Sequence, residues 1–182
     1  MSPITINGSG TLSGVTAGLT ADSMPTGSVV QTVNQFTDAA TTVTGQDTWG
    51  DTGLTANITP ASSSNKVLVT FNAALCGESE GYGAYRIMRD STEIGSSSLS
   101  TSGEECKFRL AWQDTGNSSR HLPQVTVMYL DSPSTTSQVT YKLQMNPKRT
   151  DSKSSYLNRP HHLDDTNKFA GTSSTILMEI KG

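Results

Sequence analysis

Apolar and polar residues alternate with a period of two along most apolar stretches of this sequence. The alternation is clearest in Leu54–Thr59, Val67–Ala73 and Val139–Met145, where every second residue is apolar. A period of two sends successive side chains to opposite faces of a β-strand, and no segment shows the 3.6-residue period of an amphipathic helix. The pattern therefore predicts an all-β protein whose strands each bury one face.

Turn signals separate these strands. The pair Asp90-Ser91 predicts a hairpin, and the stretch Asp131–Ser137 (DSPSTTS) joins two alternating strands. Connections this short leave no room for crossover helices, so we expect antiparallel pairing in roughly eight to ten short strands, an antiparallel jelly-roll-like β-sandwich. The side chains predicted to face inward are Leu54, Ala56, Ile58, Val67, Val69, Phe71, Ala73, Cys106, Phe108, Leu110, Trp112, Val125, Val127, Tyr129, Val139, Tyr141, Leu143, Met145, Ile176, Met178 and Ile180, with Glu179 and Lys181 outward.

The chain divides into a polar arm, residues 1–26, and a head domain, residues 27–182. The arm consists mostly of Gly, Ser, Thr and Ala, and its isolated apolar residues are too sparse to build a core. We therefore predict an extended N-terminal arm that anchors the head to a larger assembly. The apolar residues expected to make that anchor are Ile4, Ile6, Leu12, Val15 and Leu19.

Hydrophobic residues make up 33% of the chain, a low share for a globular protein. A core this thin indicates that a subunit interface completes it, and we expect a homotrimer. Strands such as Gln138–Met145 are candidates for that contact, because their outer residues Thr140, Lys142 and Gln144 are polar enough to pair across an interface.

Charge and hydropathy argue against several classes of partner. The chain has 13 basic and 16 acidic residues and a formal net charge of −3, so no nucleic-acid partner is expected. No apolar run approaches the roughly 20 residues of a membrane span, and the N-terminus lacks the pattern of a secretory signal. We expect no membrane insertion, and we expect synthesis and folding in a cytosol. There Cys76 and Cys106 are predicted to be buried thiols, with a bridge between them as the alternative.

One segment, Asn146–Lys168, contains two prolines and few apolar residues, and it is locally basic in an acidic chain. Structureless loops longer than about 12–15 residues usually bind something or are disordered. We predict an exposed loop that contacts a partner, and the alternative is a loop that folds over its own sheet edge to block strand addition. The candidate contact residues are Arg149, Tyr156, Arg159, His161 and His162, together with Trp49 from a turn-rich stretch.

No arrangement of residues predicts chemistry. The pair His161-His162 lies near Asp164-Asp165, but adjacent side chains rarely point at one ion, so no metal site is predicted. Carboxylate pairs such as Glu78/Glu80 and Glu104/Glu105 fall in polar turns, and the many serines are not expected to act as nucleophiles. The protein is therefore predicted to be no enzyme and to need no cofactor.

Four phrases of the sequence point to a family when they are taken together: ITINGSGTLSG in the arm, MPTGSVVQTVNQ at the first strand, YLDSPSTTSQVTYKLQ, and the terminal SSTILMEIKG. Over most of Ile4–Gly182 the chain resembles the tail fibre and related virion proteins of tailed bacteriophages of marine and cyanobacterial hosts. The resemblance implies a trimeric β-sandwich head carried on a virion, and recognition of the host surface for fibre members.

The function expected from this resemblance is that of a virion structural protein made in the host cytoplasm. The expected form is a trimeric tail fibre or receptor-binding head, docked on other virion proteins by its arm and contacting a host surface glycan. Fibre proteins usually carry a long shaft before the head, and the short arm here raises the alternative of a capsid decoration (cement) protein. A third alternative is a carbohydrate-binding module, since Trp49 and Trp112 are of the residue type that stacks on sugars.

Overall fold

The computed structural model describes residues 5–6, 12–13, 20, 23–45, 48–78, 82–96, 110–113, 122–147, 153–161 and 170–182. Within these ranges the secondary structure is all strand, apart from turns and bends, and the predicted all-β class is confirmed. The strands are β1 (Thr5–Ile6), β2 (Leu12–Ser13), β3 (Val29–Thr37), β4 (Thr41–Thr44), β5 (Gly50–Ile58), β6 (Lys66–Gly77), β7 (Tyr82–Arg89), β8 (Thr92–Ile94), β9 (Leu110–Gln113), β10 (Gln124–Asp131), β11 (Val139–Pro147), β12 (Ser154–Leu157) and β13 (Ser173–Ile180).

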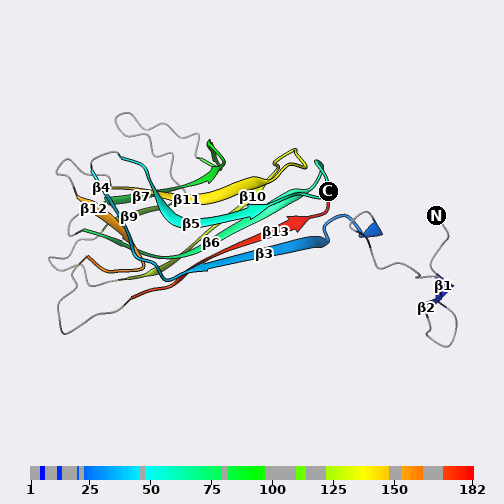
Figure 1. Cartoon of the computed structure of the whole chain (residues 1–182), viewed down its shortest axis with the longest axis horizontal. Coiled ribbons are helices and arrows are strands. Elements are labelled where there is room, and N and C mark those ends of the chain that lie inside the picture. The colour runs from blue at the N-terminus through cyan, green and yellow to red at the C-terminus, as the bar shows by residue number, and fades with distance from the viewer. Residues whose placement is uncertain are drawn as a thin grey trace.

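The head is a sandwich of two antiparallel sheets (Figure 1). In the first sheet β6 is central, with β10 along one side. On its other side β6 pairs first with β13 and then, nearer its C-terminal end, with β12. The strand β3 lies beyond β13, and β4 lies beyond β12. The strands β3 and β4 therefore act together as one interrupted strand, and so do β12 and β13.

The second sheet has the order β5-β11-β7-β8. The strand β9 pairs with the same side of β7 as β8 does, opposite β11, so β8 and β9 share one sheet edge. The predicted hairpin at Asp90-Ser91 is confirmed, because it joins β7 to β8, and Asp90 adopts the left-handed conformation (φ 52°) that such turns require. The predicted link between two alternating strands, 131–137, carries the chain from β10 in one sheet to β11 in the other.

The two ends of the sandwich are different. The arm end holds the start of β3, the C-terminus and the turns 59–65, 90–91 and 132–138; Figure 1 shows the C-terminus beside the start of β3. The opposite end, called the distal end here, holds the end of β6, the starts of β7 and β10, the end of β11 and the described residues 158–161 and 170–172. The strand register fixes this assignment, since Lys66 of β6 is opposite Ile180 and Gly77 is opposite Ser155.

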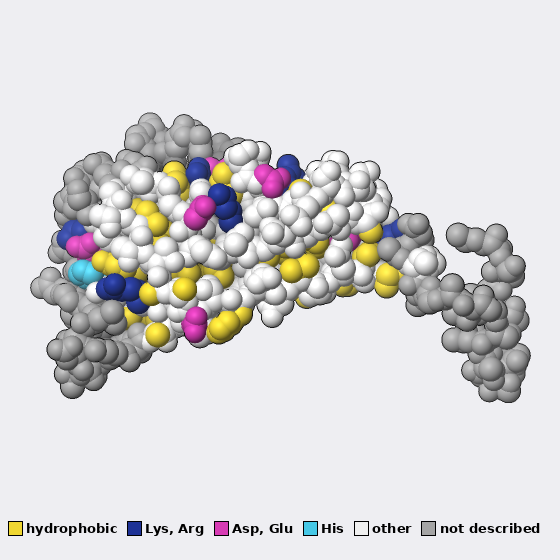
Figure 2. Space-filling view, viewed as in Figure 1, with side chains coloured by type: hydrophobic (Ala, Val, Ile, Leu, Met, Phe, Trp, Pro, Cys, Tyr) yellow, Lys and Arg dark blue, Asp and Glu magenta, His cyan; other side chains and the backbone are white. Residues whose placement is uncertain are grey.

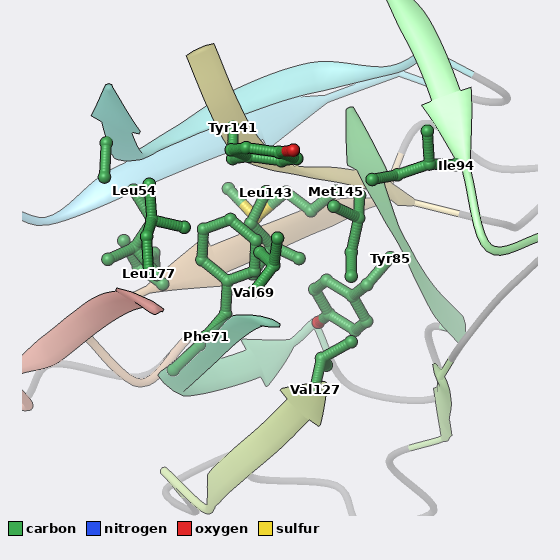
Figure 3. Close-up of a cluster of buried hydrophobic side chains, with 14 of the residues drawn as sticks. Leu54, Val69, Phe71, Tyr85, Ile94, Val127, Tyr141, Leu143, Met145 and Leu177 are labelled. Carbon is green, nitrogen blue, oxygen red and sulfur yellow. The ribbon is translucent and has the colours of Figure 1, made fainter. Parts of the chain in front are cut away.

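The core lies between the sheets and consists mainly of alternating residues that the sequence predicted, joined by residues that it did not, such as Tyr85, Ile94 and Leu177 (Figure 3). Phe71 from the first sheet and Tyr85, Tyr141 and Leu143 from the second are fully buried. The inward prediction is confirmed for every named residue of β5, β6 and β11, and for Val127 of β10, beside which Val125 and Tyr129 are partly buried. Of the remaining predictions, Cys106 and Phe108 lie outside the described residues, and the side chains of Leu110 and Trp112 are not described.

The inward face predicted for β13 is wrong. The buried residues of this strand are Ser173, Thr175, Leu177 and Glu179, whereas Ile176, Met178 and Ile180 lie on the outer face of the sheet and are partly exposed. Because side chains alternate along a strand, a shift of one residue exchanges the two faces completely. Glu179 was expected to face solvent, and its burial instead turns Ile176, Met178 and Ile180 to the outer face.

Glu179 is fully buried and holds three parts of the arm end together. Its carboxylate accepts hydrogen bonds from the Ala61 backbone N–H (2.8 Å), from Asn65 Nδ2 (2.5 Å) and from Gln31 Nε2 (2.5 Å). Asn65 in turn accepts a hydrogen bond from the backbone N–H of Gly182 (3.0 Å). A buried carboxylate is tolerated when its oxygens are hydrogen-bonded, and here neutral donors do this.

Asn158 lies at the interruption between β12 and β13, which pair with successive parts of β6. It is fully buried and left-handed (φ 60°), a conformation that Asn tolerates better than most residues. Its backbone N–H donates to Ala74 O, and its Nδ2 donates to the carbonyls of Thr37 and Ala39, between β3 and β4. Its Oδ1 accepts from Ser173 Oγ at 2.6 Å. One side chain therefore links the interruption between β3 and β4 to the interruption between β12 and β13.

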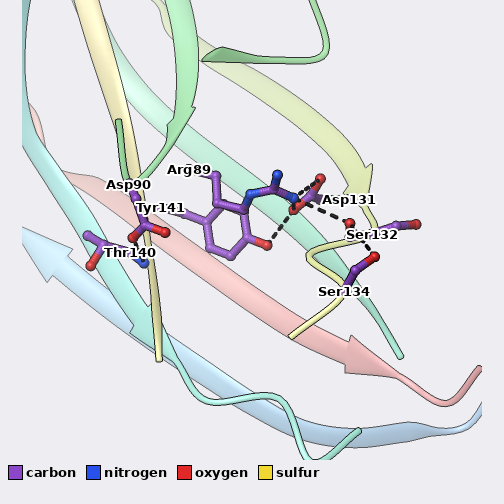
Figure 4. A network of polar contacts seen from close by, with 7 residues as sticks. All are labelled: Arg89, Asp90, Asp131, Ser132, Ser134, Thr140 and Tyr141. Atoms are coloured by element: carbon purple, nitrogen blue, oxygen red, sulfur yellow. Dashed lines mark hydrogen bonds and ion pairs between the residues drawn. The ribbon is translucent and has the colours of Figure 1, made fainter. Parts of the chain in front are cut away.

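A second polar cluster ties the two sheets together at the arm end (Figure 4). Arg89 Nη1 donates to both carboxylate oxygens of Asp131 (3.1 and 2.9 Å), and Tyr141 Oη donates to Asp131 Oδ2 (2.7 Å). The adjacent hairpin is fixed to β11, because Asp90 Oδ1 accepts from the backbone N–H of Thr140. Asp131 belongs to the first sheet and its partners to the second, so the cluster fixes how the sheets are stacked.

Tyr85 and Tyr141 allow a direct test of this cluster, because both are fully buried core residues. Burial raises the pKa of both hydroxyls, and for Tyr141 the hydrogen bond to Asp131 raises it further. The Tyr85 hydroxyl has no hydrogen-bond partner among the described residues.

We expect Tyr141→Phe to lower the free energy of unfolding by about 1.5–3 kcal/mol, because it leaves part of a buried carboxylate unsatisfied. Tyr85→Phe removes an unpaired buried hydroxyl, so it should be neutral or stabilising by up to about 1 kcal/mol. Urea unfolding of the two variants, each measured against the unmodified chain, checks this. Equal losses for both substitutions would contradict the structural role assigned to Asp131.

Candidate assembly face and distal cluster

The segment expected to be one long loop contains a strand. Residues Ser154–Leu157 form β12, which is buried along its whole length and is paired on both sides, with β6 and β4. The exposed-loop prediction is therefore wrong for this part, and so is the expected exposure of Tyr156, which is only 6% exposed. The alternative, a segment that folds onto its own sheet, describes β12 better. Replacing the segment by a linker would remove an interior strand.

Beside β12, three of the predicted contact residues lie together at the distal end. The Arg159 guanidinium lies over the Tyr156 ring, 4.7 Å from its centroid, and the His161 ring stacks on Tyr156 with centroids 5.6 Å apart. Arg159 also donates to the backbone carbonyls of Pro160 and His161. Arg159 and His161 are partly exposed, whereas Arg149 and His162 lie outside the described residues.

Glu78, at the end of β6, completes this distal cluster. Its backbone N–H donates to Ser154 O, and its Oε2 accepts from the Ser154 backbone N–H, each at 2.9 Å. Its Oε1 lies 3.5 Å from Lys153 Nζ and 3.9 Å from His161 Nε2. Burial raises the pKa of Tyr156, and the neighbouring Glu78 adds to the effect against the opposing Ser154 hydrogen bond and Arg159 charge. The cluster thus combines two cations, Lys153 and Arg159, with one imidazole and one carboxylate.

The predicted contact residue Trp49 belongs to a different surface, the outer face of the second sheet. Arg86 covers one side of its ring, with the guanidinium carbon 4.2 Å from the ring centroid. When the Asn146 amide is oriented with its oxygen toward the indole, that oxygen accepts from Trp49 Nε1 at 3.2 Å. Trp49 is partly buried, and one of its two faces is not open to a sugar ring.

A network of polar side chains extends from Arg86 across the same face. Arg86 donates to Gln144 Oε1 (2.7 Å) and Glu93 Oε2 (3.2 Å), and Asp51 accepts from Gln144 Nε2 (2.6 Å) and Lys142 Nζ (3.1 Å). Burial raises the pKa of Asp51, but the Gln144 and Lys142 hydrogen bonds and the nearby cations outweigh it, so that the pKa lies below its ordinary value. Two of the outer residues of β11 that were expected to pair with another subunit, Lys142 and Gln144, make side-chain hydrogen bonds within their own sheet, and the pairing across an interface stays a prediction.

The described part of the chain shows no constellation for catalysis or metal binding. Within it, no group of three or more His, Cys, Asp or Glu residues could hold a metal ion. The sequence of Gly77–Gly81 (GESEG) has the letters of the G-x-S-x-G nucleophile motif. That motif needs a strand-to-helix turn, and here the segment connects strand β6 to strand β7. Cys76 is buried in β6, and its thiol donates to the Gly77 carbonyl.

Among the residues that the structure describes, no helix is long and apolar enough to cross a membrane.

The most unusual surface of the head is the outer face of the first sheet, called the assembly face here. Every large hydrophobic side chain classed as exposed among the described residues lies on it: Val29 (44%), Phe36 (63%), Met128 (54%) and Leu130 (48%). The outward residues of β13 and β6 add the partly exposed Ile176, Met178, Ile180 and Leu68. In the view of Figure 2, hydrophobic side chains reach the surface of the head at several places among uncharged and charged polar ones.

The register of the sheet makes these residues contiguous. Leu130, Leu68 and Met178 are successive neighbours across β10, β6 and β13, and the next row toward the distal end places Met128 and Ile176 on either side of Thr70. Toward the arm end, Ile180 is opposite Val29. The result is a band that runs along the sheet to the point where the arm joins the head.

The remaining side chains of the assembly face are mainly Thr, Asn and Ser. They include Thr32, Asn34, Asn72, Thr126 and Ser174, and Lys66 at the arm end is the charged residue among the described ones on this face. The outer face of the second sheet, by contrast, carries the charged network around Arg86 and Asp51. The two outer faces of the sandwich therefore differ in the partners that they suit.

The assembly face was missed from the sequence because β13 contains three consecutive apolar residues, Ile176, Leu177 and Met178. Either alternation is then possible, and the assumption that a glutamate points to solvent selected the wrong one. The signal that could have helped is in β10, where Met128 and Leu130 alternate with a second apolar set, so that both faces of that strand are apolar.

The arm residues proposed as an anchor are described only in part. Ile6 in β1 is opposite Leu12 in β2, and these two short strands pair with each other and with neither sheet of the head. The side chains of Ile6 and Leu12 are not described, and Ile4, Val15 and Leu19 lie outside the described residues. At the junction, Gly27 N–H donates to Lys181 O, and Lys181 N–H donates to Ser28 O. The arm thus leaves the head beside the C-terminus.

Comparison with known proteins assigns no role to these surfaces. No protein-family model matches the chain, and neither does any curated protein sequence. Function is therefore inferred from the residues and geometry of the chain itself.

Glu179 is expected to control the assembly face, because its burial fixes the register of β13. We expect Glu179→Ala to lower the free energy of unfolding by about 2–4 kcal/mol, since it leaves three donors, among them the buried Asn65 amide, without their acceptor. Glu93→Ala is the matched control: it breaks one ion pair with Arg86 between partly exposed side chains, and it should cost less than about 1 kcal/mol. Guanidinium unfolding checks both values, and a loss below 1 kcal/mol for Glu179→Ala would contradict the assignment.

Proposed function

We propose that this chain is a non-enzymatic structural protein of a tailed-phage virion. In this proposal the head forms a homotrimer, the N-terminal arm docks it on other virion proteins, and the assembly acts as a tail fibre or receptor-binding head. The observation that carries the proposal is the difference between the two ends of the sandwich. The arm and the C-terminus leave from one end, while the distal cluster and its neighbouring connections occupy the other.

An attached, outward-facing head needs this polarity. A chain that is anchored at the arm end presents its distal end away from the particle, where a receptor would be met. The distal cluster supplies cations, an imidazole and a partly covered aromatic ring, which suit an anionic or polar partner such as a surface glycan. Arg149 and His162 are placed by sequence next to this cluster, and we propose them as further contacts.

The strand order gives independent support for a virion role. If each interrupted strand is counted once, from β3/β4 as the first to β12/β13 as the eighth, the sheets have the orders 1-8-3-6 and 2-7-4-5. We infer from this order that the sandwich is a jelly roll, the eight-stranded double Greek key that viral capsid and lectin domains use. This is the finer fold that the sequence suggested.

Capsid decoration is the second candidate, and the assembly face is the observation that favours it. A broad uncharged apolar face could also bind a shell protein, with the arm adding a second contact. The two candidates differ in copy number, because a fibre is present as a few trimers at the tail and a decoration protein covers the shell. The carbohydrate-binding module has less support, since Trp49 has one ring face covered by Arg86 and Tyr156 is buried.

Deleting residues 1–24 should separate anchoring from folding. We expect the truncated head to remain folded and trimeric, with a melting temperature within about 3 °C of the full chain, because the arm strands pair with neither sheet. We expect the truncated chain to be absent from phage particles purified on a density gradient. A chain whose first 24 residues are scrambled at constant composition is the matched control, and it should also fail to bind.

Two results would contradict the proposal. If the truncated chain is incorporated as efficiently as the full chain, the arm is not the anchor. If the full chain is absent from purified particles, the protein is not a virion component. Quantifying its gel band against the major capsid protein then decides between tail and shell.

A further inference from the structure

We propose that the assembly face is the surface through which three copies of this chain pack around a threefold axis that runs parallel to the strands. The inference rests on the proposed homotrimer and names the surface that forms it. The occupant of the face is a second copy of the same face, offset so that the β10 side of one subunit packs against the β13 side of the next.

The charge of the face suits a contact between identical copies. A charged residue in the middle of such a contact would be buried against the other half of the face and would need an opposite charge there, because a buried charge left unpaired costs several kcal/mol. On the described part of the assembly face, the charged residue Lys66 lies at the arm-end margin, and the central rows contain only apolar and uncharged polar side chains. The face can therefore pack against another copy without burying an unpaired charge.

The side chains of β10 give a second reason. Met128 and Leu130 on its outer face are 54% and 48% exposed, so the apolar band is open on the β10 side of the face. Between Gln124 and Leu130 the strand carries neither a charge nor a proline, and it pairs with β6 in an unbroken register. This side of the face is therefore regular and uncharged, as a packed contact with the β13 side of another copy requires.

The arm and the polarity of the head restrict the direction of the symmetry axis, and the number of copies around it comes from the proposed homotrimer. A twofold axis across the strands would place two arms at opposite ends, so only one of them could reach the particle. An axis parallel to the strands keeps all arms at one end and all distal clusters at the other. A ring with such an axis closes through heterologous contacts, in which two different halves of one face meet. The apolar band reaches Val29 and Ile180 beside the arm junction, so the contact would hold the arms together where they leave the head.

The test places two glutamates in the proposed contact, Met128→Glu/Leu130→Glu. The matched control is Thr55→Glu/Asn57→Glu, which changes two exposed, alternate residues of the edge strand β5 on the other sheet. Light scattering over a concentration series measures the mass of each chain. We expect the control and the unmodified chain to have the mass of three chains at micromolar concentration. The β10 variant should have the mass of one chain, with association weakened at least about 100-fold.

A milder variant covers the case in which the glutamates prevent folding. Met128→Thr/Leu130→Thr keeps residues that favour β-strands and removes only apolar surface. We expect it to have an unchanged circular dichroism spectrum and a trimer dissociation constant raised at least about tenfold. An unchanged dissociation constant would overturn the inference.

The remaining outcomes separate this inference from the proposed function. If the unmodified chain is trimeric and the folded β10 glutamate variant is trimeric too, another surface forms the trimer, and the virion role is unaffected. If the unmodified chain is a dimer, the threefold arrangement is wrong. If it is a monomer at micromolar concentration, both the proposed homotrimer and its interface are wrong, whereas incorporation into particles still tests the virion role separately.

Discussion

The burial of one carboxylate determines which face of β13 is available for assembly. Glu179 accepts hydrogen bonds from Ala61, Asn65 and Gln31, and these donors hold it between the sheets at the arm end. A strand has only two side-chain registers, so fixing one residue inward fixes all of its neighbours. With Glu179 inward, Ile176 and Met178 must face out, and they join Leu68, Met128 and Leu130 in one apolar band.

The other polar clusters stabilise the frame on which that band is displayed. Asp131, held by Arg89 and Tyr141, joins the two sheets at the arm end, and Asn158 joins the interrupted strands near the distal end. Each is a buried group with its hydrogen bonds satisfied, and such groups favour one arrangement of the sheets over others that would leave them unpaired. The apolar core supplies most of the driving force for folding, and these contacts specify the register.

The sequence predicted the fold class and most of the core, because strict alternation in β5, β6 and β11 allows only one buried face. It failed in β13, where three consecutive apolar residues allow either alternation and the partners that bury Glu179 are far away in sequence at Gln31, Ala61 and Asn65. The strand β12 was missed because Ser154–Leu157 is short, mostly polar and preceded by basic residues, although its two neighbours bury it completely. The stacking of Tyr156 with Arg159 and His161 followed from a cluster of residue types that the sequence did identify.

Oxidative footprinting of the methionines is the most direct test of the assembly face. Met128 and Met178 lie on the face, and the fully buried Met145 is an internal reference. In the assembled unmodified chain, Met128 and Met178 should be oxidised about as slowly as Met145. In a monomeric Leu130→Glu variant they should react much faster, while Met145 does not change. Equal reactivity of Met128 and Met178 in the two states would show that the face is not an interface, and a Met178 that is protected even in the monomer would show that β13 has the opposite register.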